Sequence, residues 1–138
     1  MKLEGRGFDP REFFKLVEEA INSINKGDSK CVLSITEGLY RTIVSRAYYS
    51  LFLRVRKALI RKDMKKLMKR QRSIHILVIK RLRKLGYNDI AELLNELRQR
   101  RTEADYDLAK HVDRRTAIYS YNLAKKLHEL IDKARLDP

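Results

Sequence analysis

Apolar residues recur at intervals of three and four along most of this chain, which is the spacing of one face of an α-helix. Residues that often precede a helix, Asp9, Ser73, Asn88 and Asp113, stand directly before these runs. Only two prolines and five glycines interrupt the 138 residues. We therefore predict an all-α fold, a four- to five-helix up-and-down antiparallel bundle.

Five segments of the chain are predicted to be helical. They are residues 10–26, 36–62, 73–85, 88–105 and 113–138, with 106–111 as a connection and 29–35 left unassigned. A length of 138 residues is sufficient for one hydrophobic core and short for two. We therefore predict a single domain over residues 1–138 with its core within about 10–135.

The apolar residues of the second segment cover more than one side of a helix. They are Leu39, Ile43, Ala47, Tyr48, Leu51, Phe52, Val55, Ala58 and Leu59. Such a helix either lies at the centre of the bundle or turns a second face toward another subunit. We expect a homodimer on this ground.

The net charge of +14, from 32 lysines and arginines against 18 acidic residues, favours a polyanionic partner, and nucleic acid is the first to consider. A basic tract runs from Arg54 to Arg72 and continues through Lys80, Arg81, Arg83 and Lys84. Because aromatic residues are not interleaved there, any contact would be to phosphate and shape rather than to sequence. The alternative is a solvated charged face.

The end of the fourth segment holds the first candidate site. Arg98, Arg101 and Asp105 are spaced i, i+3 and i+7, so they share one helix face, and Arg100 and Tyr106 are beside them. An arginine fork can hold a phosphate, and a nearby carboxylate or phenol could orient a ribose hydroxyl. Alternatively, Arg101 and Asp105 form an ordinary helical ion pair and Tyr106 packs beneath the helix end.

The second candidate is Arg46, which lies in the otherwise apolar middle of the long segment. We expect it to be buried and paired with Asp105 or Glu103, because a buried charge needs a partner, with the Tyr49 hydroxyl close by. Arg46 would then be structural or form the floor of the site. The candidate catalytic residues are Arg98, Arg101, Asp105 and Tyr106, and the candidate binding residues are Arg46, Tyr49 and Arg100.

The histidines do not suggest a metal site. His75, His111 and His128 are in different segments and have no metal-ligating neighbour at i+3 or i+4. His75 is expected to be a capping or surface residue at the start of the third segment. The sequence contains no glycine-rich phosphate loop either, so neither a metal nor a cofactor is predicted.

Cys31 is the only cysteine, which fits a reducing compartment. The residues before Asp9 form no apolar export signal, and no apolar run reaches the roughly 18 residues that a membrane span needs. A cytoplasmic protein that does not contact the membrane is expected.

Three motifs, in this order and setting, resemble the HEPN superfamily. They are Arg46-Ala-Tyr-Tyr-Ser-Leu-Phe, Ser73-Ile-His and Leu97-Arg-Gln-Arg-Arg-Thr-Glu-Ala-Asp-Tyr. The likeness covers roughly residues 10–135 and is to the small stand-alone prokaryotic branch. It implies a dimeric helical bundle, often paired with a minimal nucleotidyltransferase as toxin and antitoxin.

The same resemblance implies a metal-independent ribonuclease site in many members, in which an arginine is followed four to six residues later by a histidine at the dimer cleft. Arg98 or Arg101 matches the arginine, but Asp105 and Tyr106 stand where the histidine is expected. An ordinary aspartate protonates a leaving group poorly near neutral pH. We therefore expect a protein that binds RNA, a nucleotide or a nucleotidyltransferase partner, with a composite RNA endonuclease toxin as the alternative.

Overall fold

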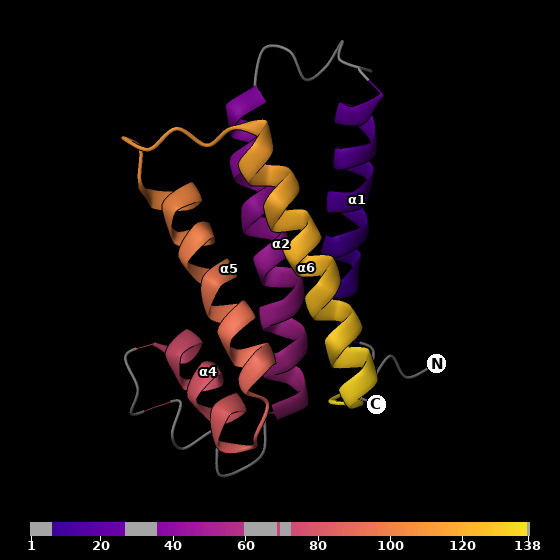
Figure 1. Cartoon of the computed structure of the whole chain (residues 1–138), viewed down its shortest axis with the longest axis vertical. Coiled ribbons are helices and arrows are strands. Elements are labelled where there is room, and N and C mark those ends of the chain that lie inside the picture. Colours follow the sequence, from indigo (N-terminus) through magenta and orange to yellow (C-terminus); the bar gives the residue numbers. More distant parts are fainter. Residues whose placement is uncertain (1–6, 27–35, 60–68, 70–72, 138) are drawn as a thin grey trace.

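The computed structural model describes residues 7–26, 36–59, 69 and 73–137. Within these ranges there is no strand, and the elements are α1 (Arg11–Asn25), α2 (Thr36–Leu59), α4 (Ile74–Lys84), α5 (Asn88–Tyr106) and α6 (Arg114–Ala134). Helices α1, α2, α5 and α6 run alternately up and down, and the shorter α4 lies beside the start of α5 (Figure 1). The all-α up-and-down prediction is confirmed.

Local capping interactions define several of the helix ends. The side chains of Ser73 and Asp113 accept hydrogen bonds from the backbone N–H groups of Ile76 and Thr116, respectively. Both residues therefore cap their helices as predicted. After α4 the chain turns at Gly86, whose φ of 91° is one that glycine adopts without strain. The third predicted segment therefore begins and ends where its capping residues indicate. The fifth begins where Asp113 indicates, but its predicted end at residue 138 is wrong, because Arg135 leaves the helix with a φ of 50° after Ala134.

Other helix ends differ from the prediction by a residue. Helix α1 begins at Arg11, where Asp9 still accepts a hydrogen bond from the Arg11 backbone N–H at 3.0 Å. Helix α5 begins at Asn88 itself, with Tyr87 in the capping position, and it includes Tyr106. The prediction that Tyr106 opens the connection is thus wrong, because capping preferences locate an end only to within a residue or two.

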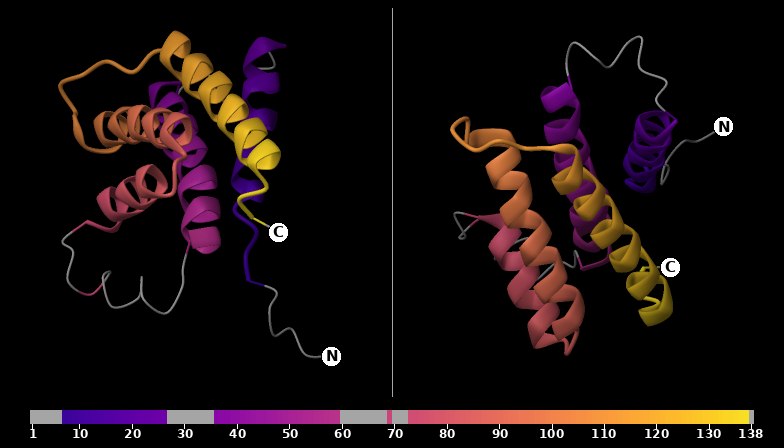
Figure 2. Two further views of the ribbon diagram at one scale, coloured as in Figure 1. Left: turned by 60° about the horizontal axis from the view of Figure 1, so that its bottom comes forward. Right: turned by 45° about the horizontal axis from the view of Figure 1, so that its top comes forward.

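Helix α2 lies at the centre and packs against each of the other four described helices. Figure 2 shows α4 and α5 on one side of it and α1 and α6 on the other. Its side chains Tyr48, Leu51 and Phe52 are fully buried. Enclosure within the bundle accounts for the apolar surface on several sides of this helix.

A few predictions fall partly or wholly outside the described residues. The second helix is described only to Leu59, and the segment 29–35 and most of the basic tract after residue 59 are not described. No described helix is both long enough and apolar enough to span a membrane.

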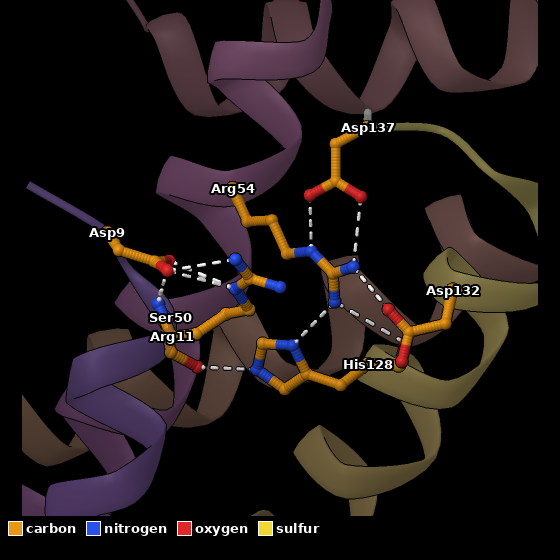
Figure 3. Close-up of polar contacts among 7 residues, drawn as sticks. All are labelled: Asp9, Arg11, Ser50, Arg54, His128, Asp132 and Asp137. Atoms are coloured by element: carbon orange, nitrogen blue, oxygen red, sulfur yellow. Dashed lines mark hydrogen bonds and ion pairs between the residues drawn. The ribbon is translucent and has the colours of Figure 1, made fainter. Parts of the chain in front are cut away.

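A buried arginine joins α2 to the end of α6 (Figure 3). Arg54 is 5% exposed and forms ion pairs with Asp132 and Asp137. Its Nη1 lies 3.0 Å from His128 Nδ1, and His128 Nε2 lies 3.0 Å from Ser50 Oγ. Since a guanidinium can only donate, His128 accepts at Nδ1 and donates from Nε2 to Ser50. Arg54 is therefore a structural residue. The prediction that the basic tract begins at Arg54 is wrong.

Replacing Arg54 with alanine should lower the free energy of unfolding by about 2 to 4 kcal/mol, because it leaves His128 and two carboxylates without their shared partner. Urea denaturation measures this. Arg11→Ala is the matched control, since its pair with Asp9 is solvent-exposed and should contribute less than about 1 kcal/mol. Equal losses in the two variants would contradict a structural role for Arg54.

Acid should destabilise the fold through His128. Burial, with Arg54 beside it, lowers the pKa of His128 from 6.5 to about 4. The unfolded chain therefore binds this proton at a higher pH than the folded one, so stability is present above pH 6.5 and is lost as the pH falls toward 4. We expect a loss on the order of 3 kcal/mol across this window.

Urea denaturation as a function of pH tests the acid effect. The variant His128→Asn does not titrate, so it should lose less stability than the wild type between pH 6.5 and 4. Parallel losses in the two proteins would assign the acid sensitivity to other groups.

Candidate functional site

The second half of α5 lies against the middle of α2 and holds Arg101 between the two helices. Arg101 is 6% exposed. Its guanidinium carbon lies 5.3 Å and 5.4 Å from the ring centroids of Tyr48 and Tyr49, and 5.9 Å from that of Tyr106. Its Nη1 is 3.8 Å from Asp105 Oδ2. Three aromatic rings and one carboxylate thus surround the arginine.

Arg101 retains a hydrogen-bond donor without an acceptor. Its Nε is buried and has no partner among the described residues. A buried donor left unpaired costs about 1 to 3 kcal/mol, and native structures rarely contain one without a reason. The 3.8 Å contact to Asp105 is too long for a hydrogen bond. The guanidinium is therefore incompletely neutralised and suited to receive an anion.

Asp105 is tied into the same cluster from a second side. Ser45 on α2 donates a hydrogen bond to Asp105 Oδ2 at 3.1 Å, and the carboxylate side chain remains 28% exposed. The i,i+4 ion pair with Arg101 that the sequence offered as the structural alternative is therefore present. Ser45 was not identified from the sequence, because a lone serine in a helix carries no distinguishing pattern.

The two neighbouring arginines have different surroundings. Arg98 is half-buried, and its Nε donates to Asn95 Oδ1 at 3.3 Å. Arg100 instead turns toward α6, where its guanidinium carbon lies 4.2 Å from the Tyr119 ring centroid and its Nη2 lies 3.9 Å from Glu96. Arg98 thus remains a candidate beside Arg101, whereas Arg100 is separated from the predicted site.

The predicted pairing of Arg46 with Asp105 or Glu103 is wrong. Arg46 is only half-buried, and its guanidinium carbon lies 5.0 Å from the ring centroids of both Phe13 and Tyr49. It makes no ion pair among the described residues. Partial exposure allows the charge to remain hydrated, and the aromatic rings replace the expected carboxylate. Arg46 therefore contacts Tyr49 as predicted, but by stacking.

His75 lies close to this cluster, although the sequence favoured a cap or a surface residue over a catalytic one. Its Nδ1 is 2.6 Å from the Tyr48 hydroxyl, and its ring centroid is 4.2 Å from that of Phe52. Burial, with Arg101 and Arg98 nearby, lowers the pKa of His75 from 6.5 to about 4. The position of His75 directly after a helix cap gave no signal for this environment.

Arg41 fixes the end of α5 that carries the cluster. Its guanidinium donates to the backbone carbonyls of Glu103, Ala104 and Asp107 at 3.3, 2.9 and 3.1 Å, and also to that of Lys110. The last carbonyls of a helix have no partner within it, so one side chain satisfies several of them. Arg41 thereby positions Asp105 and Tyr106 relative to α2.

No three histidine, cysteine or acidic side chains in the described ranges lie close enough together to hold a metal ion. The polar groups available to a ligand at the cluster are the guanidiniums of Arg98 and Arg101, the carboxylate of Asp105 and the exposed phenol of Tyr106. Arg101 beside one carboxylate, with Arg98 close enough to affect Tyr48 and His75, leaves an excess of positive charge that favours an anionic ligand.

A family model for the HEPN domain matches residues 11–134, which is most of the chain and includes α2 and α5. The chain belongs to the HEPN family. No curated protein and no solved structure gives a significant match. The resemblance of the sequence motifs to HEPN domains is thus confirmed at the level of the family, and the arginine cluster lies within the matched residues.

Asp105 and Tyr106 follow Arg101 at the end of α5 in this HEPN domain. Arg101 is followed four and five residues later by Asp105 and Tyr106 rather than by a histidine. Tyr106 is 71% exposed, so it does not pack beneath the helix end as one alternative proposed. Helix α5 contains no histidine.

Replacing Arg41 with methionine should loosen the end of α5 by about 1 to 2 kcal/mol, because several carbonyls lose their donor. Hydrogen exchange of the backbone amides should accelerate around residues 104–112 and stay unchanged in the first half of α5. The exposed Arg83→Met on α4 is the control. Unchanged exchange in the Arg41 variant would show that the α5 end is held by packing alone.

Proposed function

We propose that this HEPN protein binds RNA through its phosphates at Arg101 and Arg98, without cleaving it, and that it acts in a toxin-antitoxin type system. The observation that carries the proposal is the buried Arg101 guanidinium, whose Nε has no partner among the described residues. A phosphate placed beside the guanidinium would accept a hydrogen bond from Nε. It would also complete the neutralisation of the positive charge, since the nearest Asp105 oxygen lies 3.8 Å from Arg101 Nη1.

The wider charge of the chain supports an RNA ligand. A net charge of +14 attracts the polyanion at long range, and Lys80, Arg83 and Lys84 add exposed cations on α4, the neighbour of α5. Tyr106 is exposed at the same helix end and offers a ring on which an unpaired base can stack. Arginine, exposed tyrosine and a basic surround together favour RNA over a small uncharged ligand.

Silent binding is favoured over cleavage because the residues that would move protons are unsuited. Asp105 is engaged by Arg101 and Ser45, so its carboxylate is already occupied as a partner within the protein. The alternative is a metal-independent RNA endonuclease toxin with a site composed from two copies. The exposed Tyr106 and Leu108 beside Asp105 favour it, since a second copy could cover them.

The same proposal includes the partners that the HEPN family suggests. A homodimer would bring two arginine clusters together, and a minimal nucleotidyltransferase would be the regulatory partner. Leu108, an exposed apolar side chain just after α5, is the residue that we assign to protein contact.

Fluorescence anisotropy with a single-stranded RNA oligonucleotide at low salt tests the proposal. Arg98→Gln should weaken binding about ten-fold, which corresponds to one lost charged hydrogen bond. Arg115→Gln, on the exposed start of α6, removes the same unit of charge and should weaken binding by about two-fold or less. Equal weakening in both variants would reduce the interaction to net charge.

The RNA recovered from the same incubation, in the presence of EDTA, distinguishes binding from cleavage. Intact RNA is the expected result. Cleavage by the wild type that is lost in Arg101→Lys would overturn silent binding and establish the endonuclease alternative.

A further inference from the structure

The hydrogen bond between Tyr48 and His75 fixes the tautomer of the imidazole. Tyr48 is fully buried, and burial raises the pKa of its phenol, which therefore keeps its proton. The acceptor found for that hydroxyl among the described residues is His75 Nδ1, at 2.6 Å. Because Tyr48 donates to Nδ1, the proton of the neutral imidazole must be on Nε2.

The His75 ring stays neutral at physiological pH. It is half-buried beside Phe52, and the charged groups that face it are Arg56 on α2 and Arg98 and Arg101 on α5. Burial and these three cations oppose protonation. His75 therefore presents an uncharged Nε2–H group. This group makes no hydrogen bond among the described residues. It is also not among the buried side-chain nitrogens without a partner, so it remains available to a ligand.

His75 and Arg101 lie against the same two aromatic rings. Tyr48 and Tyr49 are 5.6 Å and 6.2 Å from the His75 ring, centroid to centroid, and their centroids are 5.3 Å and 5.4 Å from the Arg101 guanidinium carbon. The imidazole comes from α4 and the guanidinium from α5, and both helices pack on α2. The two side chains thus belong to one cluster although they are far apart in the sequence.

We propose that His75 donates a hydrogen bond from Nε2 to the phosphate held by Arg101 and Arg98, so that an imidazole from α4 occupies the site that lacks a histidine on α5. This assignment rests on the proposed RNA-binding function and adds a third donor to it. Tyr48 is the positioning residue, because its hydroxyl orients the donor.

The same hydrogen bond excludes His75 as a general base. To accept a proton at Nε2, the imidazole would have to carry its proton on Nδ1 and donate it to Tyr48. The buried Tyr48 hydroxyl would then lose its acceptor, which costs about 1 to 3 kcal/mol. A fixed neutral donor binds a phosphate without transferring protons, in agreement with RNA binding without turnover.

Two substitutions of His75 separate its two hydrogen bonds. In His75→Asn the amide oxygen reaches the Nδ1 position and can still accept from Tyr48, but the distal donor is gone. In His75→Gln the amide nitrogen reaches the Nε2 position, while the acceptor for Tyr48 is lost. We expect His75→Asn to keep its free energy of unfolding in urea and to bind RNA about ten-fold more weakly. We expect His75→Gln to lose free energy of unfolding and to keep its RNA affinity within about two-fold of the wild type.

RNA affinity as a function of pH provides the second measurement. It should stay constant from about pH 8 to about pH 5.5, because His75 does not titrate in this range, whereas a histidine with an ordinary pKa near 6.5 would strengthen binding as it became charged. A rise in affinity near pH 6.5 that disappears in His75→Asn would overturn the neutral-donor assignment.

The outcomes distinguish this inference from the proposed function. If His75→Asn binds RNA with wild-type affinity while Arg98→Gln still binds it more weakly, the role of His75 would be overturned and the proposed function would stand. Absence of RNA binding by the wild-type protein at low salt would overturn both.

Discussion

The burial of α2 by four helices is the constraint on which the rest of the structure depends. Because most of the middle of this helix is buried, its buried polar side chains need partners, and several find them on neighbouring helices. Tyr48 meets His75 on α4, Ser45 meets Asp105 on α5, and Arg54 meets α6. These polar contacts therefore set how each helix lies on the central one, in addition to the apolar packing.

The buried arginines on α2 and α5 differ in how fully the protein satisfies their hydrogen bonds and charges. Arg54 has two carboxylates and a histidine, and Arg41 has the final carbonyls of α5, so both are satisfied within the protein. Arg101 is as deeply buried as Arg54, yet it has one distant carboxylate and an unpaired Nε. We propose that Arg101 is the residue prepared for a ligand, because its unpaired Nε lies in the cluster against α2, whereas Arg100, whose Nε is also buried and unpaired, lies against Tyr119 of α6.

The helices could be predicted from the sequence because spacing and caps are local, and so could the shared face of Arg101 and Asp105. The partners of Arg46 and the environment of His75 could not, because they depend on which helices pack together. Arg46 was expected to need a carboxylate, but partial exposure and two aromatic rings suffice. His75 resembles a surface residue in sequence, and only its contact with Tyr48 reveals its setting. Among the described residues, the Nε atoms of Arg100 and Arg101 are buried without a partner, and that of Arg101 lies in the cluster against α2.

The central claim is that Arg101 belongs to a phosphate-binding site formed by α5 and α4 against α2. A crystal structure of the protein with a short RNA oligonucleotide tests it most directly. The account predicts a phosphate within hydrogen-bonding distance of the Arg101 and Arg98 guanidiniums and of His75 Nε2. RNA bound only along the outer lysines and arginines of α4, with Arg101 still paired to Asp105 alone, would contradict it.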